Sequence, residues 1–225
     1  MTKRISRQLN SFKYKGEPIK ITLGTLLLTA FCVLLLIVAT FTQITLTHYY
    51  LPFDWLNYVS GNYSELEISQ HFTKIYRYIP QIPVVFFIIA LLGRKFGILA
   101  ISLYIILGMF FPIFALGGGV TYLFEYGFGY ILAFIPAIFF SGTLLKVKSD
   151  FFRIVLLSVL GVLAIHILGV LYMLFIATLR HASMDIVSSW IASQSSIQIL
   201  YDMFFSTVAI YLGRFARKLF WIIMC

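Results

Sequence analysis

Charged side chains are scarce in this chain of 225 residues. Only 11% of the residues are Asp, Glu, Lys or Arg, whereas 61% are hydrophobic and the mean hydropathy is +0.97. Soluble proteins carry about 25% charged residues. Because so few charges cannot cover the surface of a water-soluble fold, the composition excludes a soluble globule. It predicts one integral membrane domain over residues 1–225.

Cysteine and the familiar catalytic patterns are also nearly absent. Cys32 and Cys225 lie far apart and form no metal-binding or disulfide pattern. The chain has no HExxH, GxSxG or Walker phosphate loop, and no paired carboxylates within an apolar run. We therefore expect no enzyme, no metal and no resident cofactor. Without a nucleotide site, any uphill movement of a solute would draw its energy from a partner or a gradient.

Long apolar runs separated by charges predict an all-α membrane protein with six transmembrane helices, since a span needs about 20 apolar residues. The second run is short and begins with Pro80 and Pro83, which leaves a re-entrant segment as the alternative. Only a tight turn at 93–97 joins it to the third run, so these two should form an antiparallel hairpin. The predicted spans are 21–47, 78–93, 96–116, 128–145, 154–179 and 195–219.

Basic residues are distributed unevenly over the loops that this topology creates. Of the 17 Lys and Arg residues, 14 lie on the side that holds both termini, leaving Lys74, Arg77 and Arg180 on the other. The positive-inside rule makes the first side cytoplasmic, so residues 1–20 are a basic cytoplasmic tail. Basic loops against anionic lipid headgroups account for the net charge of +9. No pattern indicates nucleic-acid binding.

Three segments remain on the outer side: 48–77, 114–130 and 180–194. The first mixes polar residues with aromatics such as Tyr50 and Trp55, which is typical of the membrane interface. A short amphipathic helix is expected there.

Asp202 is the one acidic residue within a predicted span. A charge at the centre of a bilayer costs about 2.5–3.5 kcal/mol on insertion scales, so such residues usually face a cavity or a partner. A helix that starts near Ser195 puts Asp202 about 10 Å below the outer surface, with Gln198 one turn above it. We interpret the two as a pocket wall, with an interhelical hydrogen-bond clamp as the alternative. His166, in the fifth span, is interpreted as a hydrogen-bonded interior histidine.

Gly117, Gly118 and Gly119 interrupt the apolar sequence in the stretch FALGGGVTYLFEYGFGY. Glycines permit positive φ and leave backbone N–H groups uncovered, which suits an anion-binding concavity. Tyr122, Tyr126 and Tyr130 follow at four-residue intervals and would stack if the segment were helical. An ordinary glycine-rich turn with interface tyrosines is the alternative, and composition alone slightly favours it. Glu125 has no predicted role.

One stretch, from Ile79 to Ala137, carries a family resemblance. It reads IPQIPVVFFIIALLGRKFGILAISLYIILGMFFPIFALGGGVTYLFEYGFGYILAFIPA. Several of its features resemble those of the BioY family. They are the short proline-containing helix, the basic turn into Gly97, the run Pro112–Ala115 before the glycine triplet, and Gly129-Tyr130. Members of that family are biotin-specific substrate-binding (S) components of energy-coupling factor (ECF) transporters. The stretch covers about a quarter of the chain.

The resemblance implies a compact six-helix S-component bundle in the bacterial cytoplasmic (inner) membrane, binding biotin near the outer face. It also implies two kinds of partner, a membrane coupling protein and two cytoplasmic ATPase subunits. The family's sixth helix carries an Asp with a Lys three residues later. Asp202 matches the Asp, but Phe205 replaces the Lys. At the family's Ala-xxx-Ala docking spacing in the first helix, the chain has only Thr25 and Thr29.

Biotin's chemistry suits the residues at these positions. Its ureido N–H groups can donate to the Asp202 carboxylate, and its rings can pack on Tyr122 and Tyr130. Its carboxylate is expected at the glycine segment with help from Arg180 or Arg77. Gln81 is a further candidate polar contact. The predicted ligand-binding residues are Asp202, Gln198, Tyr122, Tyr130, Gln81, Gly117, Gly118, Gly119 and Arg180.

Two other interpretations stay open. Phe205 at the Lys position is compatible with an S component or permease for another small carboxylated ligand. The second alternative is a membrane scaffold or assembly factor that transports nothing. Binding of a small ligand would distinguish it from a biotin S component and from a transporter of another carboxylated ligand.

Overall fold

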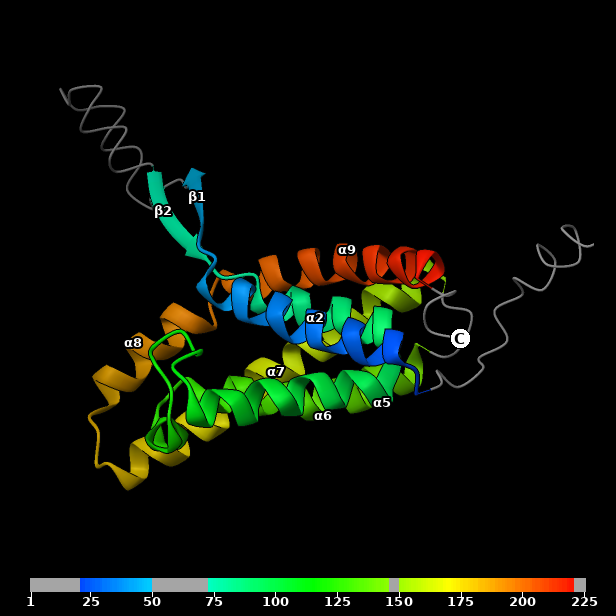
Figure 1. Ribbon diagram of the computed structural model, residues 1–225. Coiled ribbons are helices and arrows are strands. Elements are labelled where there is room, and N and C mark those ends of the chain that lie inside the picture. The colour runs from blue at the N-terminus through cyan, green and yellow to red at the C-terminus, as the bar shows by residue number, and fades with distance from the viewer. Residues whose placement is uncertain (1–20, 50–72, 146–149, 221–225) are drawn as a thin grey trace, which may run out of the picture.

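The structure is a computed structural model that describes residues 21–49, 73–145 and 150–220. The predicted cytoplasmic tail 1–20 and the interface aromatics Tyr50 and Trp55 lie outside these ranges. Five long helices run side by side and the smaller elements gather at one end (Figure 1). The long helices are α2 (Leu23–Phe41), α5 (Gln81–Phe110), α6 (Phe128–Leu144), α7 (Phe151–Leu179) and α9 (Gln198–Leu219). The smaller elements are β1 (Ile44–Tyr49), β2 (Thr73–Tyr78), the 3₁₀ helix η1 (Val120–Phe124) and α8 (Met184–Gln194).

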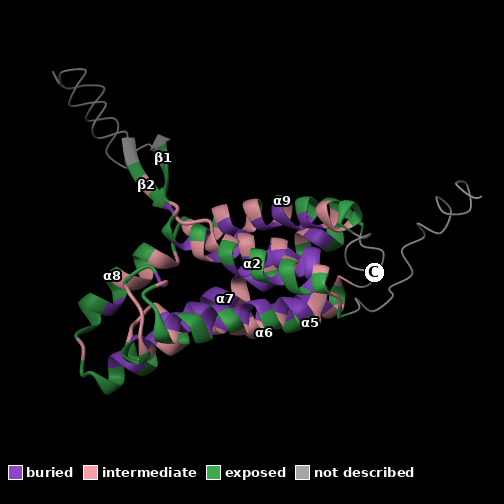
Figure 2. Cartoon of the chain, in the orientation of Figure 1, coloured by how far each residue is buried: buried purple, intermediate pink, exposed green. Residues whose placement is uncertain are grey.

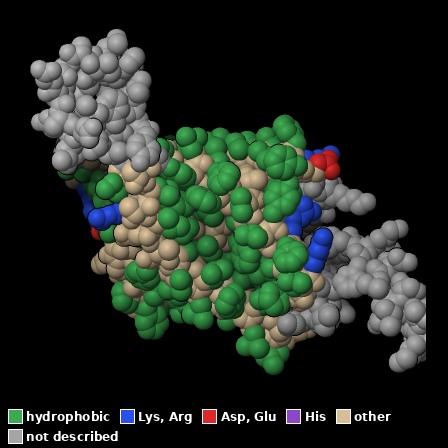
Figure 3. All heavy atoms as spheres, turned by 90° about the horizontal axis from the view of Figure 1, so that it is seen from above, with side chains coloured by type: hydrophobic (Ala, Val, Ile, Leu, Met, Phe, Trp, Pro, Cys, Tyr) green, Lys and Arg blue, Asp and Glu red, His purple; other side chains and the backbone are tan. Residues whose placement is uncertain are grey.

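The helices are apolar on their outer faces as well as in the core, which is the pattern of a membrane protein. Four segments of the described chain are long and apolar enough to cross a bilayer: Leu23–Phe41, Gln81–Phe110, Phe151–Leu179 and Met184–Leu219. Helix α6 is a shorter apolar helix. Exposed and buried residues alternate around each helix (Figure 2), and one broad flank of the molecule is covered by hydrophobic side chains (Figure 3).

Helix α5 is a hairpin of two helices rather than one rod. Gly93 breaks its helical geometry with φ of 73° and ψ of −176°, a conformation that glycine adopts readily. The Gln81 amide donates to the Tyr104 hydroxyl at 2.8 Å, although these residues would be roughly 35 Å apart along a straight helix. The contact closes the two halves on each other. The predicted turn at 93–97 and the antiparallel hairpin are therefore confirmed.

The first helix is shorter than the predicted span, which was wrong at its C-terminal end. Helix α2 stops at Phe41, and Ile44–Tyr49 forms a strand that pairs antiparallel with Thr73–Tyr78. The register runs from Ile44 opposite Tyr78 to Tyr49 opposite Thr73. Alternating β-branched and aromatic residues favour a pleated strand over a helix in both segments. The ends of the first outer segment are thus strands, not an amphipathic helix.

Other boundaries differ from the predicted spans by a few residues. The second half of α5 ends at Phe110, and residues 111–119 form a turn closed by mutual backbone hydrogen bonds of Phe114 and Gly117. Helix α9 begins at Gln198, because Ser195 caps the separate helix α8. Pro83 lies in the first turn of α5, where no backbone N–H is needed.

Close helix contacts depend on glycines that face bulky side chains. A Cβ at Gly161 would lie 2.6 Å from the Phe86 ring, and one at Gly213 would lie 2.6 Å from the Phe87 carbonyl oxygen. Small residues let membrane helices approach closely enough to pack. Helix α5 packs against α9, α2 and α6, while α7 packs against α6 and α9. This arrangement brings α5, α6, α7 and α9 together at the end that carries α8.

Candidate functional site

A pocket of about 210 Å³ opens at the end of the bundle that carries α8. Ligand pockets for drug-sized molecules measure about 300–1,000 Å³, so this one suits a small ligand. Apolar and aromatic side chains form most of its wall, with several glutamines among them. The lining residues are Gln43, Ile79, Gln81, Ile82, Ala115, Leu116, Tyr122, Gly127, Tyr130, Ile131, Phe134, Trp190, Gln194 and Gln198.

Gln81, at the start of α5, is held by two hydroxyl groups. Its Nε2 donates to the Tyr104 hydroxyl at 2.8 Å and to Thr40 Oγ1 at 3.1 Å. The Thr40 hydroxyl already donates to the Leu36 carbonyl, so Thr40 can only accept from Gln81. This orientation of the amide uses both of its N–H groups. Its carbonyl oxygen is therefore the part of Gln81 that can accept a hydrogen bond from a ligand.

Gln198, in the first turn of α9, has the opposite polarity. The Tyr76 hydroxyl donates to Gln198 Oε1 at 2.9 Å, and one amide N–H of Gln198 is directed at Asp202, which leaves the other N–H to reach a ligand. Burial, with Asp202 and Tyr201 nearby, raises the pKa of Tyr76 to about 12. Tyr76 therefore keeps its proton and remains a donor at physiological pH.

Strand β2 supplies two matched donors to α9. The Tyr78 hydroxyl donates to Asp202 Oδ1 at 2.9 Å, as Tyr76 does to Gln198. Side chains two apart on a strand share a face and lie about 6.6 Å apart, close to the 6 Å between residues four apart on a helix. The spacing of the tyrosines therefore fits the spacing of their acceptors.

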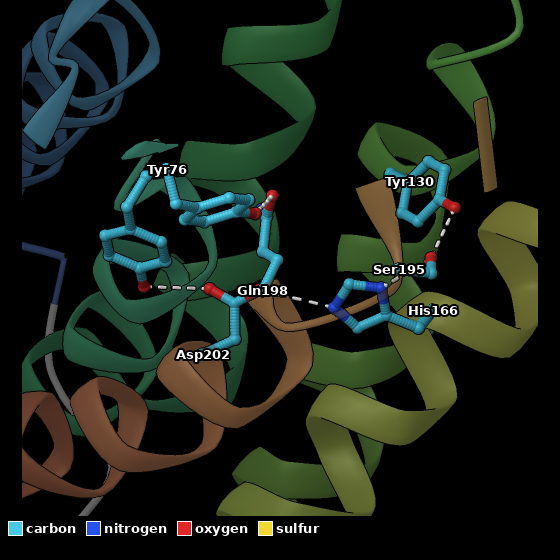
Figure 4. A network of polar contacts seen from close by, with 7 residues as sticks. Tyr76, Tyr130, His166, Ser195, Gln198 and Asp202 are labelled. Carbon is cyan, nitrogen blue, oxygen red and sulfur yellow. Dashed lines mark hydrogen bonds and ion pairs between the residues drawn. The ribbon is translucent and has the colours of Figure 1, made fainter. Parts of the chain in front are cut away.

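Asp202 is completely buried behind the pocket wall and does not line the pocket. Its second oxygen, Oδ2, lies 3.2 Å from Nε2 of His166 on α7. The other nitrogen of His166, Nδ1, lies 2.9 Å from Ser195 Oγ, which is 2.6 Å from the Tyr130 hydroxyl. Figure 4 shows this chain of contacts leading from α9 across α7 to α6. A direct contact between Asp202 and a ligand stays a prediction that requires Gln198 or Tyr78 to move.

Tyr130 reaches the pocket because α7 has no side chain beneath it. A Cβ at Gly169 would lie 2.5 Å from the Tyr130 ring. Tyr122 lines the pocket from η1 and packs on Phe114 with ring centroids 4.7 Å apart. The four-residue stacking of tyrosines is wrong, since η1 ends at Phe124 and α6 starts at Phe128. Tyr126 instead packs on Trp190.

Two of the three glycines have the predicted positive φ, but their N–H groups are not left uncovered. Gly117 and Gly119 have φ of 122° and 93°, and a Cβ at Gly118 would lie 2.1 Å from the Phe111 carbonyl oxygen. However, the N–H of Gly117 donates to Phe114 and that of Gly119 donates to Gly108. Neither glycine lines the pocket, although the preceding residues Ala115 and Leu116 do. Their contact with an anion stays a prediction.

Arg180 lies outside the pocket and has two partners at its rim. Its Nη2 is 3.5 Å from Glu125 Oε1, and its guanidinium lies 5.4 Å from the centroid of the Tyr126 ring. Both charged side chains are partly exposed, 42% for Arg180 and 38% for Glu125. Glu125, which had no predicted role, thus forms an exposed ion pair with Arg180. Arg77 lies on β2, and its side chain is exposed.

No cluster of three His, Cys, Asp or Glu side chains suited to a metal ion occurs within the described ranges.

Comparison with known protein families matches residues 66–221 to the BioY family. The chain belongs to the BioY family. Among solved structures, it is similar to the crystal structure of the S-component for biotin from an ECF-type ABC transporter. The TM-score is 0.58 at 17% identity, over 86% of this chain and 90% of that one. At that identity the likeness shows a shared fold. No match is found among curated proteins.

Within this BioY protein, four of the predicted ligand-binding residues line the pocket, namely Gln81, Gln198, Tyr122 and Tyr130. Phe205, at the position of the family Lys, packs on Tyr78 with ring centroids 5.3 Å apart. His166 is the basic group that contacts Asp202 instead. Three site residues, Tyr76, Tyr78 and Ser195, were not predicted from the sequence. The period-two tyrosines of TKIYRY were the available signal for the first two.

Proposed function

We propose that this BioY protein captures biotin as the substrate-binding subunit of an ECF-type transporter. The observation that carries the proposal is the pair of amides fixed with opposite polarity in one pocket. Gln81 offers a carbonyl oxygen, and Gln198 offers an N–H group. Biotin's ureido ring has N–H donors and a carbonyl acceptor, so it can bond to both amides at once.

The rest of biotin has matching surroundings in this proposal. Tyr122, Tyr130 and Trp190 supply aromatic surface for the fused rings. The carboxylate at the end of the valerate tail is placed toward the glycine segment Gly117–Gly119 and Arg180 at the rim. Asp202 supports the ureido end from behind Gln198. In this role the protein binds and releases its ligand without chemical change.

We also propose that both halves of α5 cross the membrane, which makes six spans with both termini on the cytoplasmic side. The hairpin contact between Gln81 and Tyr104 supports this count. The basic residues Arg94 and Lys95 at the hairpin turn support the orientation. The pocket would then face the outside of a bacterial cytoplasmic membrane.

A coupling protein and two ATPase subunits are the proposed partners, since no nucleotide-binding motif is present in the sequence. Thr25 and Thr29 do not offer them a docking surface, because both side chains are buried inside the bundle.

Uptake in a bacterial biotin auxotroph that lacks its own transporter tests the proposal. Cells that express this chain should accumulate labelled biotin, and excess lipoate or thiamine should not compete. Gln81→Ala should reduce uptake at low biotin, whereas the control Thr178→Ala should not, because Thr178 is exposed and bonds only to its own helix. Equal competition by lipoate would favour a ligand other than biotin, as Phe205 at the Lys position allows.

A further inference from the structure

A chain of hydrogen-bonded side chains links the pocket to the buried carboxylate of Asp202. The roles proposed above for Gln81 and Gln198 do not involve this chain. Its order is Tyr130, Ser195, His166 and Asp202, with contacts of 2.6, 2.9 and 3.2 Å. Tyr130 lines the pocket, while His166 and Asp202 are 3% and 0% exposed. The chain therefore has one end in the ligand site and the other at a charge.

The protons in this chain can be assigned by counting donors and acceptors. A carboxylate only accepts, so His166 Nε2 carries the proton that faces Asp202. In a neutral imidazole, Nδ1 is then an acceptor, and the Ser195 hydroxyl must donate to it. Ser195 Oγ in turn accepts from the Tyr130 hydroxyl. Every proton in the chain points away from the pocket.

This direction decides what Tyr130 can do for a ligand. Once its only proton is donated to Ser195, the Tyr130 oxygen has lone pairs alone to offer to the pocket. We propose that Ser195 and His166 are specificity-determining residues, because they turn Tyr130 into an acceptor for a ligand N–H. The inference rests on the proposed function, in which that N–H belongs to the ureido ring of biotin. Asp202 acts here as a positioning residue, through His166.

A second proton on the Asp202–His166 pair would reverse the chain. Nδ1 would then donate to Ser195, Ser195 would donate to Tyr130, and the Tyr130 proton would face the pocket. The groups that face His166 are Asp202 from α9 and the Tyr130 ring from α6, with Tyr78 from β2 bonded to the same carboxylate. Ser195, the C-cap of α8, contacts Nδ1, and Asp185 lies exposed in the first turn of α8. The preference for a ligand N–H should therefore decline toward low pH.

Matched variants and matched ligands test this inference. The ligands are biotin and its two analogues with a methyl group on one ureido nitrogen. Ser195→Ala removes the link, and Ser195→Thr restores a hydroxyl at the same place. Tyr130→Phe removes the acceptor itself. Ser206→Ala is the control, because it removes another fully buried serine hydroxyl, one whose oxygen has no hydrogen-bond partner.

The unmodified protein should prefer biotin over at least one methyl analogue, and this preference should decrease as the pH is lowered. Ser195→Ala and Tyr130→Phe should reduce the preference about 3- to 10-fold, the effect of one hydrogen bond, and abolish its pH dependence. Ser195→Thr and Ser206→Ala should keep both. An unchanged preference in Ser195→Ala and Tyr130→Phe protein that unfolds at the normal temperature would overturn the inference.

Nitrogen-15 NMR of histidine-labelled protein measures which ring nitrogen of His166 carries the proton, and it needs no ligand. Near neutral pH, His166 should carry its proton on Nε2, and the Nδ1 signal should shift in Ser195→Ala, with His166→Gln used for assignment. A proton found on Nδ1 would overturn the inference. Failure of the unmodified protein to bind biotin would count against the proposed function instead, and the NMR result would then decide on the chain of protons alone.

Discussion

The side-chain amide of Gln81 donates to the hydroxyl of Tyr104 across the hairpin of α5, at 2.8 Å. Tyr104 is completely buried and lies 5.4 Å, between ring centroids, from Phe114. One contact thus closes the fold and orients a pocket amide. The structural and ligand-binding consequences of losing it can be measured together.

Tyr104→Phe removes the hydroxyl and keeps the ring. We expect biotin affinity to decrease about 3- to 10-fold, because one N–H of Gln81 loses its partner and the amide is free to turn. The unfolding free energy should decrease by about 1 kcal/mol. Titration with labelled biotin and thermal unfolding check both effects. Tyr211→Phe on the exposed face of α9 is the control, and equal effects of the two variants would contradict the assigned role.

Gly169→Ala should displace Tyr130 from the pocket wall, because the added Cβ would lie 2.5 Å from the ring. We expect a loss of biotin affinity of tenfold or more. Gly97→Ala is the matched control, since a Cβ there meets Ile138 at an ordinary distance of 3.4 Å. Similar affinities for the two variants would show that the position of the Tyr130 ring does not matter for binding.

Glu125→Gln releases Arg180 from its ion pair at the pocket rim. If Arg180 attracts the ligand carboxylate, the variant should bind biotin more tightly than the unmodified protein, and most clearly at low salt. Biotin amide, which has no carboxylate, should bind equally to both. Exposed ion pairs contribute about 0–1 kcal/mol, so stability should hardly change. A gain that appears for biotin amide as well would exclude the carboxylate contact.

Asp202→Asn should weaken biotin binding, because an amide replaces the carboxylate that accepts from Tyr78 and His166. An amide has one accepting oxygen, so it cannot accept from both Tyr78 and His166, and its NH2 group no longer fixes the His166 proton on Nε2. Asp185→Asn, an exposed acid in the first turn of α8, is the control. Unchanged affinity in purified, folded Asp202→Asn protein would exclude both a direct and an indirect role for this carboxylate.

Much of the fold could be predicted from the sequence where the signal was local. Uninterrupted apolar runs marked the helices, and Gly93 beside Arg94 and Lys95 marked the hairpin turn. The strands β1 and β2 could not be predicted in the same way. They pair residues up to 34 positions apart, and each contains only 6 residues. Their period-two pattern was too short to be distinguished from the surrounding interface sequence.

The sequence indicated which polar residues belong to the candidate site, but not which side chains contact one another there. Intramembrane or interfacial polarity singled out Gln81 and Gln198, which line the pocket, and Asp202, which lies behind it. The role of Ser195 could not be predicted from the sequence, because it depends on contacts with His166 and Tyr130, which lie 29 and 65 residues away. The spacing of Tyr122, Tyr126 and Tyr130 led to a wrong prediction of stacked side chains, because a break at 125–127 separates η1 from α6.

Equilibrium dialysis of the purified protein in lipid nanodiscs against labelled biotin tests the central claim most directly. The account predicts saturable binding of one biotin per chain, displaced by unlabelled biotin, unaffected by equal concentrations of lipoate or thiamine, and weakened in Gln198→Ala. Binding that does not saturate, or that lipoate and thiamine displace as well as biotin does, would contradict it.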